Sequence, residues 1–349
     1  MTRTNFQDLD FIAARLHGRW AGSAEVERLD ALCRLRTIPE LARAVCPGAD
    51  IAGAADLQRR LAQDLAQELC ALTPYLSRPQ TRLLSWMLVR FQVENLKVMI
   101  RGGLTKASPE DVRACLLALP RGMELDLAAL EPGRGPRDLI GLLPDGRLRE
   151  GLREAVLISG EPDQPFFYEM GLDCGYLREL LDRADELPGE DRAAVSAMLC
   201  QEADIFHLGL LVRGRFLYGL KAEALLPWHM AGTAITRQRL AAMLEAPDLG
   251  SALGLAVRHG LDALPPAEPA PASDAGVWEA LAWKRFLRLA DEAFRRSAMG
   301  FGVVAGYTGI RRVEVANLIT LCEGIRLGVA PEAIRPRLIP RAEQRAAHV

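Results

Sequence analysis

The sequence predicts an all-α fold, and three observations lead to this prediction. Apolar residues recur at helical spacing over most of the 349-residue chain. Alternating polar and apolar stretches flanked by hairpin turns, which are typical of β-strands, do not occur in the sequence. One helix–loop–helix pattern also recurs three times along the chain, which is typical of consecutive helical units.

The first strong helix signal covers residues 54–76. Its leucines stand four residues apart on one face of an amphipathic helix: Leu57, Leu61, Leu65 and Leu69. The next helix begins near residue 78 and carries an apolar stripe that includes Leu88 and Phe91. We expect it to end at Gly102 and Gly103, because glycine is common at the C-terminal ends of helices.

Three further stretches have the same periodicity, at residues 172–187, 191–214 and 277–297. Two stretches are predicted to be connectors. Residues 130–138 are rich in Gly and Pro, and residues 261–276 form a Pro/Ala-rich linker. The tail, residues 340–349, is expected to fray.

The composition excludes several classes of protein. Lys plus Arg (43) nearly balances Asp plus Glu (45), so no net field attracts nucleic acid. The longest uncharged run, Ser297 to Ile310, is shorter than the ~20 residues that a spanning helix needs. The N-terminus lacks the apolar core of a signal peptide. Seven cysteines without a Cys-x-x-Cys pair suit reduced thiols in a cytoplasmic protein.

The sequence contains no motif for catalysis, cofactor binding or metal binding. It lacks the phosphate-binding pattern G-x-x-x-x-G-K-[S/T], and its five histidines are isolated, which disfavours a zinc site. Glu169 and Asp173 stand four residues apart and could form an acid pair or bind a divalent metal. A solvated helix face is the favoured interpretation of this pair. We therefore predict no catalytic, cofactor-binding or metal-binding residue, and no cofactor.

The internal repeat is clearest between residues 93–116 and residues 315–338, which align without a gap. Eight of the 24 aligned positions are identical, and they include a helix-end glycine and a Pro-Glu helix start. A third copy lies at residues 203–226, so the copies are about 110 residues apart. We expect three helical-bundle domains, at residues 1–122, 123–232 and 233–349.

Asn95 lies on the apolar stripe of its helix, and His207 and Asn317 occupy the same position in the other copies. A buried polar side chain must find a hydrogen-bond partner or it costs free energy. The favoured alternative is a helix-to-loop hydrogen bond that supports each domain. The other alternative is a row of polar groups that faces a central cavity or a partner. The positions predicted at the ends of the repeated helices are Arg101, Gly102, Arg213, Gly214 and Gly324.

The repeated segments resemble the C subunit of V-type and A-type rotary ATPases, the counterpart of eukaryotic subunit d. The resemblance covers essentially the whole chain and is most specific in VENLKVMIRGG…SPEDVRACL and its two copies. The family pattern is a polar residue, Asn-Leu, a basic residue near an Arg-Gly-like helix end, and then Pro-Glu. The middle copy departs from this pattern, with His207 in place of Asn and Lys221-Ala222 in place of Pro-Glu.

The resemblance implies a funnel of three similar domains in a pseudo-threefold arrangement. It implies a non-catalytic rotor subunit of the central stalk, which couples the D/F shaft to the membrane proteolipid ring. Such a subunit binds no nucleotide and no nucleic acid, is cytoplasmic, and is peripheral on the inner face of the membrane without spanning it. The loops at residues 102–108, 214–220 and 324–330 are candidate contacts, and ordinary interhelix turns are the alternative.

Two other classes of protein remain open from the residues alone. An α-helical repeat adaptor, which binds protein partners outside an ATPase, would show sub-repeats of about 35–45 residues within one copy. An all-α enzyme would need a cluster of carboxylates or histidines, for which only Glu169 and Asp173 are available.

Overall fold

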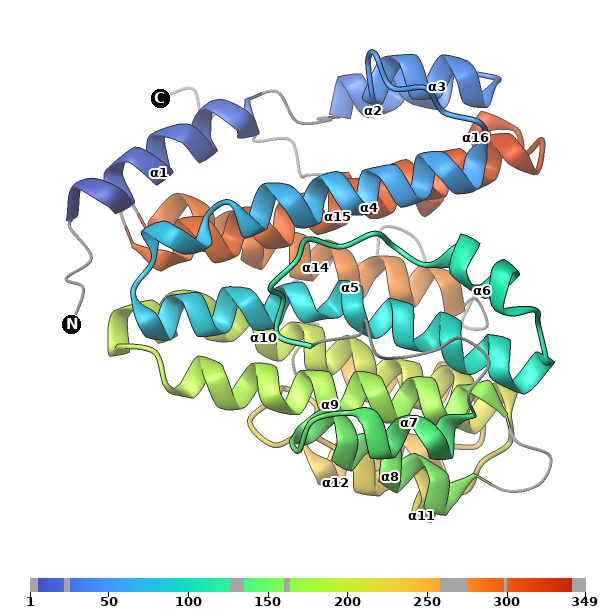
Figure 1. Cartoon of the computed structure of the whole chain (residues 1–349). Coiled ribbons are helices and arrows are strands. Elements are labelled where there is room, and N and C mark those ends of the chain that lie inside the picture. Colours follow the sequence, from blue (N-terminus) through green and yellow to red (C-terminus); the bar gives the residue numbers. More distant parts are fainter. Residues whose placement is uncertain are drawn as a thin grey trace. The chain divides into compact units, whose positions relative to one another are not determined.

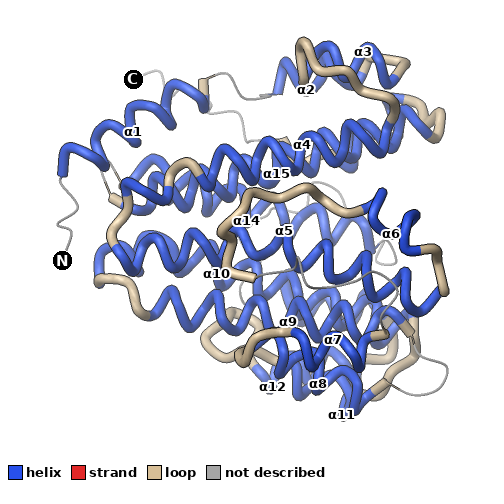
Figure 2. Tube along the Cα trace, in the orientation of Figure 1, coloured by secondary structure: helices blue, strands red, loops and turns tan. Residues whose placement is uncertain are grey.

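The computed structural model describes residues 6–21, 26–125, 135–159, 164–257, 275–297 and 300–340. Within these ranges every regular element is a helix and no strand occurs (Figure 2), so the predicted all-α fold is confirmed. Most of the predicted linker at residues 261–276 and of the tail at residues 340–349 lies outside the described residues.

The chain divides into two compact units, and their boundaries differ from those of the repeats. The first unit comprises residues 1–65 and 274–349, and the second comprises residues 66–273. The division into three repeat domains therefore remains a prediction.

The first unit is built around its two longest helices, α14 (Ala275–Arg296) and α15 (Phe301–Arg326), which lie side by side (Figure 1). A Cβ atom at Gly306 would lie 2.5 Å from the carbonyl oxygen of Ala290, so glycine is required for this close approach. The other helices of the unit are α1 (Phe6–Trp20), α2 (Val26–Cys33), α3 (Ile38–Val45), α16 (Pro331–Ile334) and the 3-10 turn η4 (Arg335–Arg337).

Helix α4 (Ala54–Cys70) crosses the boundary between the two units. It is shorter than the predicted helix of residues 54–76, and the 3-10 turn η1 (Thr73–Tyr75) follows it. The helix cannot continue because Pro74 has no backbone N–H to donate and its ring clashes with the preceding turn.

The second unit has α5 (Arg78–Thr105), α9 (Pro165–Asp185) and α10 (Gly189–Gly209) as its longest helices, and α9 packs on both of the others. The π-helix η2 (Leu210–Leu217) continues α10. The shorter elements are α6 (Pro109–Cys115), α7 (Pro136–Leu142), α8 (Arg147–Ile158), α11 (Ala222–Leu225), η3 (Leu226–Trp228), α12 (Arg237–Glu245) and α13 (Leu249–Val257).

The continuous helix Gly189–Leu217 is long and apolar enough to cross a membrane by length and composition. In the structure, 67% of its most apolar window is buried within the protein. Such a helix, hydrophobic on most sides and covered by neighbours, is typical of the core of a large helical bundle.

Helices α8 and α9 approach each other unusually closely through glycines. A Cβ atom at Gly151 would lie 2.1 Å from the carbonyl oxygen of Gly171, and one at Gly175 would lie 2.3 Å from that of Arg147. Backbone atoms cannot move aside as a flexible side chain can. Glycine is therefore required at these positions for the two backbones to meet.

We expect Gly151→Ala to destabilise the protein by about 2–3 kcal/mol, because the added methyl group forces the two helices apart. The Tm should fall by about 3–4 °C in a thermal unfolding experiment. Gly209→Ala is the matched control, since Gly209 has helical φ and ψ angles and open space around its Cα. It should raise stability by about 0.5–1 kcal/mol. Equal Tm values for the two variants would contradict the prediction.

Candidate interaction site at the ends of the repeated helices

The same arrangement occurs at the ends of the three repeated helices, α5, α10 with η2, and α15. Each long helix is followed by a loop, then by a short helix (α6, α11 or α16), and then by an extended return segment. We call the segments that connect each long helix to its short helix the tip loops and define them as Gly102–Ser108, Gly214–Leu220 and Gly324–Ala330. Each includes the last three or four residues of the long helix.

Asn95 and Asn317 hold the return segments of their copies with the same pair of hydrogen bonds. The Asn95 amide donates from Nδ2 to the carbonyl oxygen of Leu117 (3.0 Å), and its Oδ1 accepts from the Leu117 N–H (2.8 Å). Asn317 bonds Ile339 in the same way, at 2.9 and 2.8 Å. In both copies the bonded residue lies 22 positions further along the chain.

His207 makes the corresponding contact in the middle copy. Its Nε2 accepts a hydrogen bond from the backbone N–H of Met230 (3.0 Å), which lies 23 positions further along. Because Nε2 is the acceptor, the proton of the neutral ring is on Nδ1, which lies 3.5 Å from Oδ1 of Asp204. His207 is completely buried. All three repeat-equivalent side chains thus bond a loop backbone within their own copy.

The three helix-end glycines allow the short helices to pack against the long ones. A Cβ atom at Gly102 would lie 2.3 Å from Cγ2 of Val112 on α6, and one at Gly324 would lie 2.3 Å from Cδ1 of Ile334 on α16. At Gly214 the nearest atom, Cδ2 of Leu225 on α11, would be 2.8 Å away. An aliphatic side chain therefore occupies the space left by each missing Cβ.

These glycines lie within their helices and do not end them, contrary to the expectation from the sequence. Helix α5 continues past Gly102 to Thr105 and ends at Lys106, which has a left-handed backbone (φ 54°). The left-handed position of the other copies is a second glycine, Gly219 or Gly328 (both φ 66°). The sequence pattern was misleading because glycine is needed at position 102 to leave room for the side chain of Val112, and not to allow a left-handed backbone.

The middle copy contains one additional residue, and the π-helix accommodates it. The left-handed residue follows the buried glycine by four positions in the first and third copies, and by five in the middle copy. In η2 the N–H of Tyr218 bonds the carbonyl oxygen of Arg213 (2.9 Å), which is an i to i−5 turn. This wider turn keeps the short helix and the return segment in place despite the insertion.

The predicted helix-end arginines do not share one role. Arg101 donates from Nε to Oε1 of Glu169 on α9 (2.5 Å), whereas Arg213 is exposed. In the third copy the position is Glu323, which accepts hydrogen bonds from Gln58 and Arg326. The three copies therefore share neither the charge nor the partner of the residue at this position.

The tip loops of the second and third copies expose apolar side chains. Leu217 and Tyr218 are 70% and 44% exposed, and Leu327 and Val329 are 63% and 39% exposed. The first tip loop instead exposes polar residues such as Lys106. Burial of a leucine at an interface is worth about 1.5–3 kcal/mol, so these loops are candidate contacts for another protein.

Glu169 and Asp173 do not lie on a solvated face, so the interpretation favoured from the sequence is wrong. Their side chains are only 17% and 16% exposed, because the helix face that carries them packs against α5. Asp173 bonds Arg90 (2.9 Å) and Lys97 (2.7 Å), and Lys97 itself is 7% exposed. Burial disfavours the charged form of Arg90, but the carboxylates of Asp173, Glu94 and Glu202 outweigh burial and raise its pKa.

These ion pairs occupy carboxylate oxygens of both residues that a metal ion would otherwise use. Among the described residues, no group of three or more His, Cys, Asp or Glu side chains could hold a metal ion. The four-residue spacing correctly predicted that both carboxylates share one face of α9. Their pairing with cationic side chains of α5 depends on the packing of α9 on α5, which the spacing does not predict.

The ring of His229 stacks on that of His207, with centroids 4.9 Å apart and planes 9° from parallel. Its Nε2 lies 2.9 Å from the carbonyl oxygen of Ile235. Burial lowers the pKa of His229 below its ordinary value of 6.5, more than the Ile235 carbonyl raises it. The folded protein therefore favours the neutral ring.

Comparison with known proteins gives one family match. A family model described as the ATP synthase (C/AC39) subunit matches residues 12–337 of the chain. This range contains the first two copies of the repeat and all but the last residue of the third. No individually curated protein matches the chain significantly.

We expect Asn317→Ala to destabilise the protein by about 2 kcal/mol, because the N–H and the carbonyl oxygen of Ile339 both lose their partner. Amide hydrogen exchange should become faster in residues 330–340. Thr320→Ala on the same helix is the control, since its hydroxyl bonds only the Ala316 carbonyl of its own helix. Its effect should stay within about 0.5 kcal/mol. Unchanged exchange at Ile339 in Asn317→Ala would contradict the prediction.

We expect His229 to make the protein less stable at acidic pH. Its pKa is lower in the folded than in the unfolded chain, so unfolded molecules bind more protons as the pH falls through 6.5. The free energy of unfolding therefore decreases as the pH falls from 6.5 to the lower pKa that His229 has in the folded chain. The urea midpoint of the wild type should fall further between pH 7 and pH 5 than that of His229→Gln. Parallel pH profiles would refute this assignment.

Proposed function

The chain belongs to the ATP synthase (C/AC39) subunit family, and on this basis we propose that it is a rotor subunit of the central stalk of a V/A-type ATPase. In this proposal it couples the D/F shaft to the proteolipid ring of the membrane sector, so that ATP turnover and ion translocation are mechanically linked. The match to the family over residues 12–337 is the observation that carries the proposal.

A coupling subunit must transmit torque without bending, and several features of the packing support that role. Glycine contacts bring α8 against α9 and α14 against α15 at backbone distance. Ion pairs link α5 to α9 through Asp173, and breaking a buried pair costs about 3–5 kcal/mol. Close-packed interiors of this kind have low compressibility and transmit strain.

A coupling subunit also needs fixed contact surfaces, and the tip loops supply candidates. Each loop connects a long helix to a short helix, and an aliphatic side chain of the short helix packs on the glycine of the long one. The return segment that follows the short helix is hydrogen-bonded to a polar side chain of the long helix. The exposed Leu217 and Leu327 are therefore presented on a rigid base. An interface that resists slipping should bury ~1,000 Å² or more, so the tips would form only part of it.

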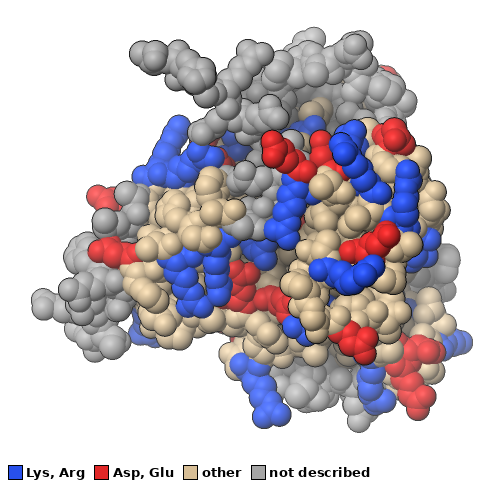
Figure 3. Space-filling model, turned by 90° about the horizontal axis from the view of Figure 1, so that it is seen from above, with Lys and Arg blue, Asp and Glu red and all other residues tan. Residues whose placement is uncertain are grey.

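The distribution of charge on the surface supports contacts with partner proteins that do not depend on charge alone. On the described part of the face drawn in Figure 3, acidic and basic side chains are interspersed. The chain as a whole has a formal net charge of −2. A partner would thus be selected mainly by shape and apolar contact, and the proposal includes no nucleic acid partner.

We infer that the protein has no catalytic role and lies at the cytoplasmic face of the membrane as a peripheral subunit. The acid pair that could have supported an enzyme, Glu169 and Asp173, is neutralised by Arg101, Arg90 and Lys97. The apolar helix Gly189–Leu217 is mostly covered by the protein itself.

Affinity purification of the tagged chain from native membranes in mild detergent, followed by mass spectrometry, tests this function. The proteolipid, the D/F shaft and the catalytic ATPase subunits should be recovered together with the chain. Recovery of the chain without ATPase subunits under every extraction condition would refute the proposal and favour an adaptor.

We expect Leu217→Asp and Leu327→Asp to weaken assembly with the ATPase by about 10–100-fold each, since each removes a buried leucine contact and adds a charge. The isolated variants should stay within about 0.5 kcal/mol of wild-type stability, because both side chains are exposed. Leu157→Asp is the control: Leu157 is 85% exposed on α8, outside the tip loops. Recovery of all ATPase subunits at wild-type levels with both tip variants would show that the tips are ordinary turns.

A further inference from the structure

The middle copy differs from the other two in the chemistry that holds its return segment. Asn95 and Asn317 bond their return segments through side-chain amides, which do not titrate. In the middle copy the corresponding bond runs from the Met230 N–H to Nε2 of His207, and an imidazole can take up a proton near neutral pH. Of these three equivalent attachments, only the one in the middle copy depends on the protonation state of its acceptor.

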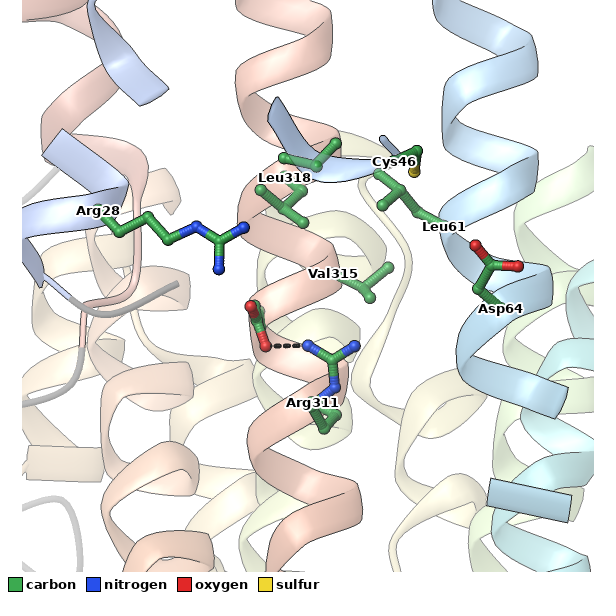
Figure 4. A pocket seen from close by; sticks show the side chains of 9 residues that line it. Arg28, Cys46, Leu61, Asp64, Arg311, Val315 and Leu318 are labelled. Carbon is green, nitrogen blue, oxygen red and sulfur yellow. Dashed lines mark hydrogen bonds and ion pairs between the residues drawn. The ribbon is translucent and has the colours of Figure 1, made fainter. Parts of the chain in front are cut away.

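The position three residues earlier on each long helix also distinguishes the middle copy. Three polar residues occupy it: Gln92, Asp204 and Glu314. Gln92 bonds both backbone groups of Leu125, at 2.6 and 3.2 Å. Glu314 pairs with Arg311 of its own helix, and both residues line a pocket of the first unit (Figure 4). Only Asp204 lies beside an imidazole at the next repeat position, with Oδ1 3.5 Å from Nδ1 of that ring.

Three neighbouring side chains join the return segment of the middle copy to α10. We call them the histidine cluster: Asp204, His207 and His229. The carboxylate of Asp204 accepts from the backbone N–H groups of Ala234 (3.0 Å) and Ile235 (2.9 Å). His229 belongs to the segment itself, where its Nε2 lies 2.9 Å from the carbonyl oxygen of Ile235 and its ring stacks on that of His207. Two titratable rings thus lie where this segment meets α10.

Protonation of His207 is incompatible with this arrangement. An imidazolium carries a proton on both nitrogens, so Nε2 can no longer accept from the Met230 N–H. Asp204 faces Nδ1, which carries a proton in either state, and therefore does not replace the lost bond. The ring of His207 is completely buried, and a second charge on His229 would lie only 4.9 Å away between ring centroids. Proton uptake therefore favours a conformation in which both rings reach water.

The elements around the histidine cluster contribute further titratable groups. Arg237 on α12 adds a positive charge that lowers the pKa of His229. On α9, burial raises the pKa of the Cys174 thiol, which bonds the Trp228 carbonyl, to about 12. Burial also raises the pKa of Cys200 on α10, and Asp185 at the end of α9 raises it further. Both thiols stay neutral in acid, so Asp204 is the anion that lies next to the rings.

We propose that the histidine cluster is an acid-sensitive switch, in which proton uptake by His207 and His229 releases residues 229–236 from α10. The return segments held by Asn95 and Asn317 stay bound at the same pH, because their amides do not titrate. Release of the middle segment removes one of the two attachments of its tip loop, so acid changes one copy of the three. This inference does not depend on the proposed function.

Amide hydrogen exchange between pH 7.5 and pH 5, followed by mass spectrometry, tests the proposal within one molecule. Peptides that contain Met230, Leu117 and Ile339 report on the three return segments, and each rate is divided by that of an unstructured peptide at the same pH. Protection at Met230 should fall about 10–30-fold more than at the other two sites, as one proton bound below a pKa of about 6.5 requires. An equal fall at all three sites, or none at Met230, would overturn the proposal.

His207→Gln tests which ring is responsible, since glutamine offers an oxygen that can accept from the Met230 N–H and does not titrate. The fall in protection at Met230 should then be within about threefold of that at Leu117, even if the variant is less stable at every pH. His17→Gln on α1 is the control and should keep the wild-type pH dependence. The wild-type pH dependence in His207→Gln would overturn the proposal. If this variant fails to fold, the comparison of the three segments in the wild type still decides.

Discussion

The hydrogen bonds from Asn95, His207 and Asn317 to the return segments are the constraint on which the repeated arrangement depends. Each side chain is buried on a long helix, and each bonds backbone groups 22 or 23 residues away. A buried backbone group without a partner costs about 1–3 kcal/mol, so the return segment cannot shift freely. The short helix then packs against the buried glycine, and the tip loop between them is held at both ends.

The middle copy shows that the contact is preserved while the residues that make it change. Histidine replaces asparagine, and one residue is inserted after Gly214. Asp204 bonds Ala234 and Ile235 where Gln92, at the same position of the first copy, bonds Leu125. The π-turn at Tyr218 absorbs the insertion, and the aliphatic contact between Gly214 and Leu225 is retained. A wide turn near a helix end therefore lets one copy vary in length without losing its supporting bonds.

Charged side chains in this protein act mainly inside the fold. Arg90 and Lys97 on α5 meet Asp173 on α9, and Arg101 meets Glu169 one turn away along the same pair of helices. These contacts cross between helices, and they are partly shielded from solvent, so salt screens them less than it screens surface pairs. They join α5 and α9 into one body, which is the stiffness that the proposed coupling role requires.

The sequence alone determined the all-α class, the family and the positions of the three copies, because periodicity and repetition are local properties of the chain. It identified Asn95, His207 and Asn317 as anomalous on an apolar stripe, but could not choose their partners, which lie more than twenty residues away. Only the tertiary structure decided that Glu169 and Asp173 are paired, that Gly102 packs on Val112, and that Glu314 faces a pocket. Burial of a residue depends on which distant helix covers it, and the chain packs into two units that cut across the repeats.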